Sequence, residues 1–356
     1  MIGLPATGAA PLPLVTADLP GSGGSIKASP EDFRVDEIPA YAPCGEGPHL
    51  WLLVEKRGRT TRDVVREAAK LLRVQERDVG VAGLKDRHAV TVQWLSFPVA
   101  KGPDPATLAG EGWRVLTASR HGNKLRTGHS RGNRFGIVVR GGDLDRARAA
   151  ADALALRGLP NFFGAQRFGA DGRNADLGRA ILKGAGDPEA RRASRDRFLR
   201  RLSLSAWQSM LFNRWLGERM ADGLFARAIP GDVMKKLDSG GIFSCDDPAV
   251  DQPRVDRFEI SPAGPMFGHA LKPAGGEAGE REARVLAADG LTAADLARGG
   301  GEAEGTRRAA RIPVSVALEP VDGGYRASFE LPRGSYATVV MGELTRSEAE
   351  LGEAGE

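Results

Sequence analysis

A carboxylate between two cations is the strongest chemical signal in this sequence. The segment Val81-Ala-Gly-Leu-Lys-Asp-Arg-His88 places Asp86 directly between Lys85 and Arg87. Neighbouring cations favour the ionised form of a carboxylate, which suits a nucleophile or an electrostatic stabiliser better than a general acid. An aspartate that caps a β-turn has the same local sequence, so the segment by itself fits both a catalytic and a structural role.

A second segment combines aromatic rings with an amide and a guanidinium. Asn161-Phe-Phe-Gly-Ala-Gln-Arg-Phe-Gly169 follows Pro160, and its glycines predict a loop. Aromatic rings stack on unpaired bases, and asparagine pairs with a base edge or a sugar hydroxyl. The same rings could instead anchor the loop in the hydrophobic core, and we expect at least one of them to do so.

A third segment, Phe329-Glu-Leu-Pro-Arg-Gly-Ser-Tyr-Ala-Thr338, joins a predicted strand to a predicted helix. The strand is expected to end at Pro332 and the helix to begin near Ser335. Exposed backbone N–H groups at such a junction can bind a phosphate or a carboxylate. A capped turn without a ligand fits the segment equally well.

The histidine and cysteine residues form no metal or redox pattern. None of the 5 histidines pairs with a carboxylate at the i, i+4 spacing of a metal site. Cys44 and Cys245 lie far apart and outside any C-x-x-C motif, and no Walker motif is present. We therefore expect two free thiols, no metal and no cofactor.

Length and composition argue against several classes of protein. The chain has 356 residues, 41% of them hydrophobic, and a formal net charge of +4. No apolar run approaches the ~20 residues needed to span a bilayer, and the first residues lack the basic region of a secretory signal. We therefore expect no membrane association and a cytoplasmic location, and we favour a monomer over an oligomer.

Basic residues are concentrated in two runs. The first holds all the charged residues between 120 and 140, namely Arg120, Lys124, Arg126, Arg131, Arg134 and Arg140. The second, interrupted by a single aspartate, holds Arg191, Arg192, Arg195, Arg197, Arg200 and Arg201. Such segregation suits a polyanion, since each neutralised phosphate releases counterions. One such run is typical of a solvated surface, but two in one chain favour nucleic acid.

The turn that carries Asp86 is predicted to join two strands. Hydrophobic patterning predicts strands at 33–38, 49–55, 78–81, 89–96, 113–120 and 134–140. Helices are predicted from Thr61, which fits an N-cap, and over 143–157. Gly83 permits the bend before Asp86.

The middle of the chain has a different pattern. Helical periodicity runs from about 190 to 221, and the segment 230–273 predicts turns and short strands. Strands return at 312–318 and 325–331, and a final helix is predicted after Ser335. The simplest architecture is an α+β domain built from two separated pieces, with a second domain inserted between them.

Five motifs follow one another along the chain. They are Pro30-Glu-Asp-Phe-Arg-Val35, Ala82-Gly-Leu-Lys-Asp-Arg-His-Ala-Val-Thr91, Gly132-Asn-Arg-Phe135, the aromatic segment that begins at Asn161, and Leu331-Pro-Arg-Gly-Ser-Tyr-Ala-Thr338. Two more, Ser205-Ala-Trp-Gln-Ser-Met-Leu-Phe-Asn213 and Gly231-Asp-Val-Met234, lie in the middle of the chain. Together these segments resemble the TruD family of tRNA pseudouridine synthases. Each motif alone is weakly specific, but five in the family's order are strongly specific.

The resemblance implies the fold and its domains. The fold would be the α+β pseudouridine synthase catalytic domain, with a mixed central sheet, formed by residues 26–184 and 311–356. The α+β insertion typical of the TruD family would occupy residues 185–310, and residues 1–25 would be a flexible lead-in.

The resemblance also implies a role for each matched position. Asp86 would be the catalytic nucleophile, with Lys85 as its neighbouring cation, and Phe163 would stack on the flipped target base. The other contacts with the substrate nucleotide would come from Phe33, Asn161 and Tyr336, the last at a position that is commonly phenylalanine in the family. The RNA backbone would be bound by Arg87, Arg126, Arg131, Arg134 and Arg167. The resemblance gives His88 no defined task.

The implied reaction is the isomerisation of uridine to pseudouridine in tRNA, at uridine-13 of the D-arm. The enzyme breaks the N1 glycosidic bond, rotates the uracil and rejoins it through C5, which needs neither a metal nor a redox cofactor. Asp86 could attack the ribose C1′, remove a proton at C2′ or add to the uracil C6, and the sequence does not choose among these. Two other functions remain open: a non-catalytic RNA-binding protein or RNA chaperone, and a glycosidase or nucleoside hydrolase, which needs a second positioned carboxylate.

Overall fold

The computed structural model describes residues 11–99, 104, 107–169, 171–184 and 187–346. The chain forms two compact units. The large-sheet unit comprises Leu19–Asp152, Val314–Ala337 and the residues from Leu344 onward. The long-helix unit comprises the residues up to Asp18, Ala153–Pro313 and Thr338–Glu343.

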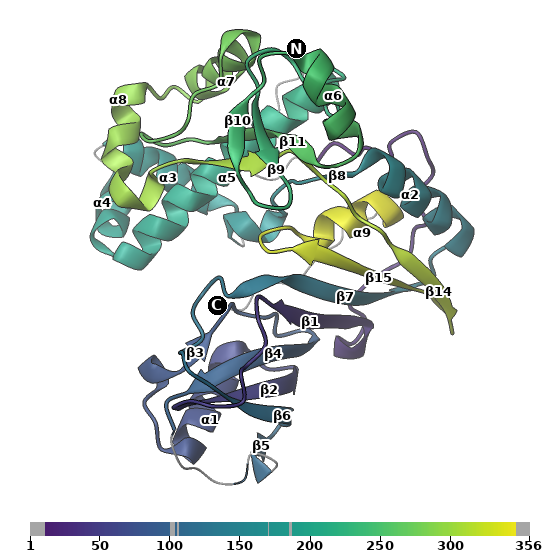
Figure 1. Cartoon of the computed structure of the whole chain (residues 1–356), viewed down its shortest axis with the longest axis vertical. Coiled ribbons are helices and arrows are strands. Elements are labelled where there is room, and N and C mark those ends of the chain that lie inside the picture. Colours follow the sequence, from purple (N-terminus) through teal and green to yellow (C-terminus); the bar gives the residue numbers. More distant parts are fainter. Residues whose placement is uncertain (1–10, 100–103, 105–106, 170, 185–186, 347–356) are drawn as a thin grey trace. The chain divides into compact units, whose positions relative to one another are not determined.

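A nine-stranded sheet forms the centre of the large-sheet unit (Figure 1). Its strands are β1 (Phe33–Pro39), β2 (His49–Arg57), β3 (Gly80–Val81), β4 (Val90–Phe97), β5 (Ala109–Gly110), β6 (Trp113–His121), β7 (Ser130–Arg140), β14 (Ala317–Val321) and β15 (Gly324–Pro332). The order is β14-β15-β7-β1-β4-β2-β6-β5, and β3 pairs with β4. Strands β1 and β4 are parallel, whereas the other pairings are antiparallel. The predicted α+β class with a mixed central sheet is therefore confirmed.

Helix α1 (Thr61–Leu72) packs against this sheet through its apolar side. Val64 and Ala68 are buried in one cluster with Leu52 of β2 and Leu95 of β4. The helix begins where the sequence predicts, although the N-cap is Thr60, whose side chain accepts from the N–H of the third helical residue. The buried Thr61 hydroxyl does not cap the helix and instead hydrogen-bonds to residues outside α1.

The long-helix unit combines helices with a smaller antiparallel sheet. The helices are α3 (Arg173–Lys183), α4 (Pro188–Arg195), α5 (Arg197–Ala221), α6 (Pro248–Asp256), α7 (Gly276–Ala288) and α8 (Ala293–Leu296). The sheet has the order β10-β9-β11-β12, with β9 (Val233–Lys236), β10 (Ile242–Ser244), β11 (Ile260–Met266) and β12 (Thr306–Ala309). Strand β8 (Leu159–Pro160) pairs with β13 (Arg311–Ile312), while α2 (Leu144–Arg157) and α9 (Ala337–Thr345) contribute residues to both units.

Two predicted elements differ from the structure, and helix α6 (Pro248–Asp256) was missed. The helix predicted over 190–221 breaks at Asp196, whose extended backbone ends α4 and whose carboxylate caps α5. The strand predicted over 312–318 ends at Ile312 and resumes at Ala317, with Pro313, which has no N–H to donate, in the gap. Helix α6 was not predicted, because the prolines at its start and in its interior indicated a loop.

The predicted lead-in is described from residue 11 onward. Residues 1–10 of the predicted lead-in lie outside the described residues. Thr16, by contrast, is buried and its N–H donates to the Glu343 carboxylate at 3.0 Å, while the Ser22 hydroxyl lies 2.7 Å from the Tyr325 hydroxyl. The boundaries at 185 and 310 stay predictions, because the compact units follow packing and do not mark the edges of an insertion.

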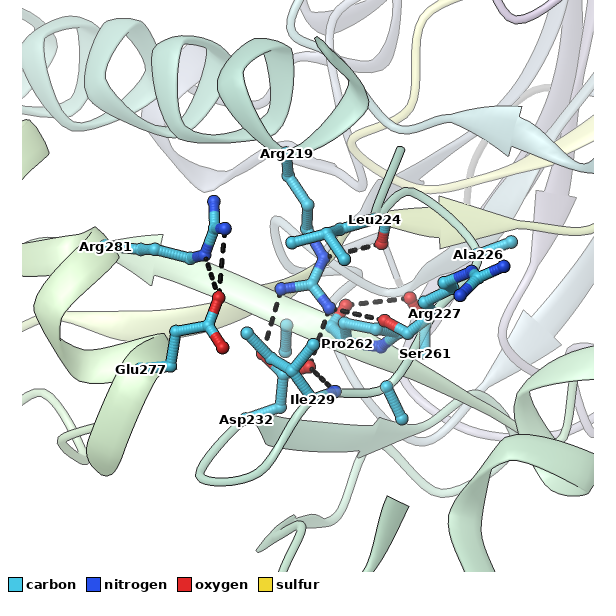
Figure 2. Close-up of polar contacts among 12 residues, drawn as sticks. Arg219, Leu224, Ala226, Arg227, Ile229, Asp232, Ser261, Pro262, Glu277 and Arg281 are labelled. Carbon is cyan, nitrogen blue, oxygen red and sulfur yellow. Dashed lines mark hydrogen bonds and ion pairs between the residues drawn. The ribbon is translucent and has the colours of Figure 1, made fainter. Parts of the chain in front are cut away.

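A buried ion pair connects α5 to the small sheet of the long-helix unit. Figure 2 shows the Arg219 guanidinium extending from α5 to Asp232. Its two terminal nitrogens donate to the two carboxylate oxygens at 2.9 and 2.6 Å, and both side chains are at most 4% exposed. Arg219 also donates to the carbonyls of Leu224 and Arg227, and Asp232 accepts from the Ile229 N–H, so both charged groups have several partners.

Removing one member of this pair leaves a buried charge without its partner. We expect Asp232→Asn to lower the free energy of unfolding by about 3 kcal/mol. Urea denaturation of Asp232→Asn measures this loss, with Arg257→Gln as the control, because Arg257 forms an exposed pair with Glu259 that contributes little. Equal stabilities of the two variants would show that the buried pair is not a major constraint.

Candidate active site

The loop that carries Asp86 is held by buried polar side chains of α1 and β4. The Thr61 hydroxyl accepts from the Lys85 N–H at 2.9 Å and donates to the Gln93 side-chain oxygen at 2.8 Å. The Gln93 amide in turn donates to the Gly83 carbonyl at 3.1 Å. Gly83 is not in the left-handed region, so the bend depends on these hydrogen bonds and not on the freedom of glycine that the sequence suggested.

The cation that pairs with Asp86 is Lys27. Its ammonium lies 3.0 Å from the carboxylate, and the two side chains are 7% and 19% exposed. The same ammonium lies 4.5 Å from the centre of the Phe33 ring. Lys27 has φ +60°, a left-handed conformation that costs an ordinary residue about 1 kcal/mol. Sequence reasoning missed Lys27, since nothing local links it to a residue so far along the chain.

A second lysine supports the backbone at Asp86. The Lys56 ammonium donates to the Asp86 carbonyl at 2.5 Å. Lys56 is buried, at a position that continues the inward-facing series Leu50, Leu52 and Val54 of β2. Burial lowers the pKa of Lys56 to about 8, although the neighbouring Asp86 charge acts in the opposite direction. A lysine in an apolar series was a sequence signal that could have identified it.

Lys85 has a different partner from the one expected. Its ammonium lies 2.8 Å from the Glu37 carboxylate, and these side chains are 8% and 1% exposed. Glu37 continues the inward-facing series of Phe33 and Val35 on β1, so it is a buried anion within an apolar face. Lys85 neutralises that anion, and the ion pair at Asp86 is made by Lys27.

Three aromatic rings lie together in the large-sheet unit. Phe33 is 4% exposed and meets Phe135 edge to face, with 6.4 Å between ring centres. Phe135 in turn stacks on Phe329 at 5.4 Å. Phe33 is thus part of the interior of the unit, with Lys27 beside its face.

Two other segments contact the Asp86 loop or its neighbours. The Gly128 N–H donates to the Ala82 carbonyl at 2.9 Å, and the Arg333 guanidinium donates to the Gly128 carbonyl at 2.9 Å. Arg333 also donates its backbone N–H to the Arg131 carbonyl at 3.0 Å. The half-buried Tyr336 follows in this turn after β15. The large-sheet unit therefore brings the first and third motifs together.

The predicted RNA-binding arginines of this unit differ in their surroundings. Arg87, Arg126 and Arg131 are exposed, and they have no ion pair within the described part of the chain. Arg134 is also exposed but pairs with Glu330 at 2.7 Å. Three of the four are thus placed to accept an anionic partner without first giving up a carboxylate.

The aromatic loop lies in the long-helix unit, where one face of α5 holds it. The Phe163 N–H donates to the Asn213 side-chain oxygen and the Phe163 carbonyl accepts from the Asn213 amide, each at 2.8 Å. Phe212 meets the Phe163 ring edge to face at 5.7 Å. Arg167 donates to the hydroxyls of Ser205 and Ser209. The spacing 205, 209, 212 and 213 places these side chains on one helix face, which explains the Ser205–Asn213 motif.

Arg308 is a further residue of this group that the sequence did not reveal. Its guanidinium lies 4.0 Å from the centre of the Phe163 ring. The same group donates to the backbone oxygen of Asn161 at 2.9 Å and to its side-chain oxygen at 2.6 Å. Phe163 is 7% exposed and Asn161 is 6% exposed. Arg308 therefore fixes both predicted nucleotide contacts within the unit.

Comparison with known proteins assigns the family. A family profile described as tRNA pseudouridine synthase D (TruD) matches residues 12–191 and 187–344. The chain belongs to the TruD family. It is 73% identical over 342 residues to the tRNA pseudouridine synthase D of Anaeromyxobacter dehalogenans strain 2CP-1, an alignment that covers 96% of this chain and 98% of that one. Identity to the protein of the same name from Thermus thermophilus is 44% over 346 residues, covering 95% and 93% of the two chains.

The fold also matches a solved structure. A crystal structure from Methanosarcina mazei that carries the TruD name superposes with a TM-score of 0.73 at 24% sequence identity, covering 94% of this chain and 96% of that one. The predicted family, fold and enzyme class are therefore confirmed: this TruD family member is an isomerase of the pseudouridine synthase class. Among its described helices, none has the length and apolarity needed to cross a membrane.

The position of Lys56 predicts a dependence of stability on pH. The pKa of Lys56 is about 8 in the folded protein and 10.5 ordinarily, so between these values the unfolded chain binds more protons. The free energy of unfolding should then rise with pH, by about 2 kcal/mol from roughly pH 7 to pH 9.5. Lys56→Met, which cannot titrate, should lack this rise. Urea denaturation at the two pH values measures the difference between wild type and variant, and parallel pH profiles would contradict the prediction.

Proposed function

We propose that the chain converts uridine to pseudouridine in tRNA, at uridine-13 of the D-arm, with Asp86 as the reacting group. Family membership supports the reaction and the substrate class, and the surroundings of Asp86 support its role. We also propose a cytoplasmic location, where this substrate would be available.

The observation that carries the proposal is the paired, partly exposed Asp86 carboxylate. Its ion pair with Lys27 orients the carboxylate, and the loop is held from two directions by Thr61 and Lys56. A side chain fixed in this way is pre-organised for attack, which lowers the entropic part of the barrier. A capping aspartate, the structural alternative, would accept from backbone N–H groups, whereas the bond described for this side chain comes from Lys27.

The proposed reaction rearranges atoms within one nucleotide. The N1–C1′ bond breaks and a C5–C1′ bond forms, while C5 loses a proton and N1 gains one, so the mass of the RNA does not change. In this rearrangement Asp86 would attack C1′, remove a proton at C2′ or add to C6. Each of them uses the carboxylate in its ionised form.

The other predicted residues would bind the RNA. Extrusion of the uridine from a structured RNA requires an aromatic surface for the base. We assign this role to Phe163, whose buried ring Arg308 would first have to uncover. Phe33, Asn161 and Tyr336 remain predicted contacts of the nucleotide. The phosphates would be bound by Arg87, Arg126, Arg131 and Arg167, whereas Arg134 would first have to exchange Glu330 for a phosphate.

A glycosidase or nucleoside hydrolase is less well supported. Such enzymes use a second carboxylate to activate water or to protonate the leaving group. Glu37 is an acid near the Asp86 loop, but its carboxylate is buried and bound by Lys85. Release of free uracil from tRNA would indicate hydrolysis, and the isomerisation predicts none.

Replacement of the carboxylate by an amide tests the proposal. Asp86→Asn should lower the rate of pseudouridine formation at least about a thousandfold, because the amide is neither a nucleophile nor a base, while tRNA binding is retained. Pseudouridine at position 13 can be mapped through carbodiimide-dependent stops of reverse transcription.

Asp145→Asn is the matched control, since Asp145 forms an exposed pair with Arg148 on α2. It should leave the stops unchanged. Equal stops from wild type and Asp86→Asn would remove Asp86 from the mechanism. Stops at another uridine would support the proposed activity but show that the target is not uridine-13.

A further inference from the structure

The second arginine run lies at exposed positions of two adjoining helices of the long-helix unit. Helices α4 and α5 meet at Asp196, which ends one helix and caps the other. Five exposed arginines lie near this junction: Arg191, Arg192, Arg195, Arg197 and Arg201. Together with Phe198 they are here called the α4–α5 surface.

These guanidinium groups have no carboxylate partners among the residues that the structure describes. Arg200, the sixth member of the run, differs because it pairs with Glu302 at 3.4 Å. The acids nearest in sequence are already engaged: Asp187 and Asp196 cap the two helices, and Glu189 pairs with Arg173 at 2.7 Å. The positive charge of the α4–α5 surface is therefore not neutralised within the protein.

Helix energetics oppose this arrangement of charge. Arg191 and Arg195 are one turn apart, as are Arg197 and Arg201, and like charges at this spacing destabilise a helix. The first turn of α5 contains no acidic residue, so its arginines face the positive end of the helix dipole. Arg192 and Arg195 in the last turn of α4 complement the negative end of that helix dipole, but Arg197 and Arg201 have no such compensation in α5. An external anion would offset the repulsion within each pair.

An exposed aromatic ring accompanies the arginines. Phe198 is 63% exposed, and the next residue, Leu199, is 38% exposed. Phe198 and Arg201 are neighbours on the surface of α5, at the i, i+3 spacing. A ring beside unpaired cations matches the chemistry of unpaired nucleotides, whose bases stack on aromatic faces while their phosphates attract arginine.

We propose that the α4–α5 surface binds tRNA through contacts other than those that hold the reacting uridine, with its arginines on phosphates and Phe198 stacked on an unpaired base. This inference rests on the proposed function for its choice of tRNA as the partner. The surface contributes affinity and leaves the chemical step unchanged, because none of its residues belongs to the group around Asp86.

Two double variants test the role of the charges. Arg191→Gln/Arg195→Gln and Arg197→Gln/Arg201→Gln should each weaken tRNA binding about tenfold, and should reduce the slope of log Kd against log salt by about 1.5. Fluorescence anisotropy with labelled tRNA at several salt concentrations gives both values. The thermal unfolding midpoint of Arg197→Gln/Arg201→Gln should equal or exceed that of wild type, since it removes a repulsive pair at the positive end of a helix dipole. That of Arg191→Gln/Arg195→Gln should stay close to wild type, because the lost repulsion is offset by the loss of Arg195 from the last turn of α4.

The matched control is Arg148→Gln/Arg257→Gln, which removes two positive charges from arginines that have carboxylate partners. Its Kd and salt slope should be those of wild type. If the test variants behave like this control, the α4–α5 surface does not bind tRNA. The rate at saturating tRNA should be unchanged in all of these variants.

Substitutions of Phe198 test stacking. Phe198→Ala and Phe198→Leu should both weaken tRNA binding about tenfold, and Phe198→Tyr should retain the wild-type Kd, because only a ring provides a stacking face. Wild-type binding by Phe198→Leu would overturn the stacking assignment.

Failure of the α4–α5 surface and failure of the proposed function give different results. A wild-type protein that forms pseudouridine, with test variants that bind like the control, would refute the surface alone. A wild-type protein that forms no pseudouridine would refute the proposed function, while the Kd and salt slope would still report on the surface.

Discussion

The ion pair between Lys27 and Asp86 is the interaction on which the site depends. A carboxylate that is only 19% exposed has lost much of its hydration, so it needs a cation close by. Lys27 provides this cation from a left-handed backbone position that is itself unfavourable, and its ammonium also lies against Phe33. The strain is offset because β1, β4 and the preceding segment are fixed by the sheet. Backbone strain and the contact with the candidate nucleophile thus occur at the same residue.

Three lysines near the Asp86 loop have separate tasks. Lys27 binds the Asp86 carboxylate, Lys56 binds the carbonyl of the same residue, and Lys85 neutralises Glu37. Because each ammonium has its own acceptor, the loop is held at the Asp86 side chain, at the Asp86 carbonyl and, through Lys85, at Glu37 of β1. The same principle applies in the long-helix unit, where Asn213 binds the backbone of Phe163 and Arg308 lies against its ring. Both candidate groups are thus held by several contacts within their own unit.

Local patterns in the sequence predicted much of the fold and part of the site. Period-two alternation identified most strands of the large sheet, and the family motifs singled out Asp86 and Phe163, whose roles stay predictions. Lys27 and Arg308 were not predicted, because they reach their partners through strand pairing between distant segments, which leaves no local pattern. The ion pair of Lys85 with Glu37 was not predicted for the same reason: Glu37 lies on another strand. Lys56 could have been found, since a lysine in an apolar series indicates a buried charge.

The most direct test is the single-turnover rate of pseudouridine formation by Lys27→Met at saturating tRNA. The variant removes the cation but keeps an unbranched side chain of similar length, and Lys27 is too buried to contact phosphates itself. A role in orienting Asp86 predicts a rate about a hundredfold below wild type with an unchanged Kd for tRNA. Lys70→Met, at an exposed lysine of α1, serves as the control and should react at the wild-type rate. A wild-type rate for a folded Lys27→Met would contradict the central role of the ion pair.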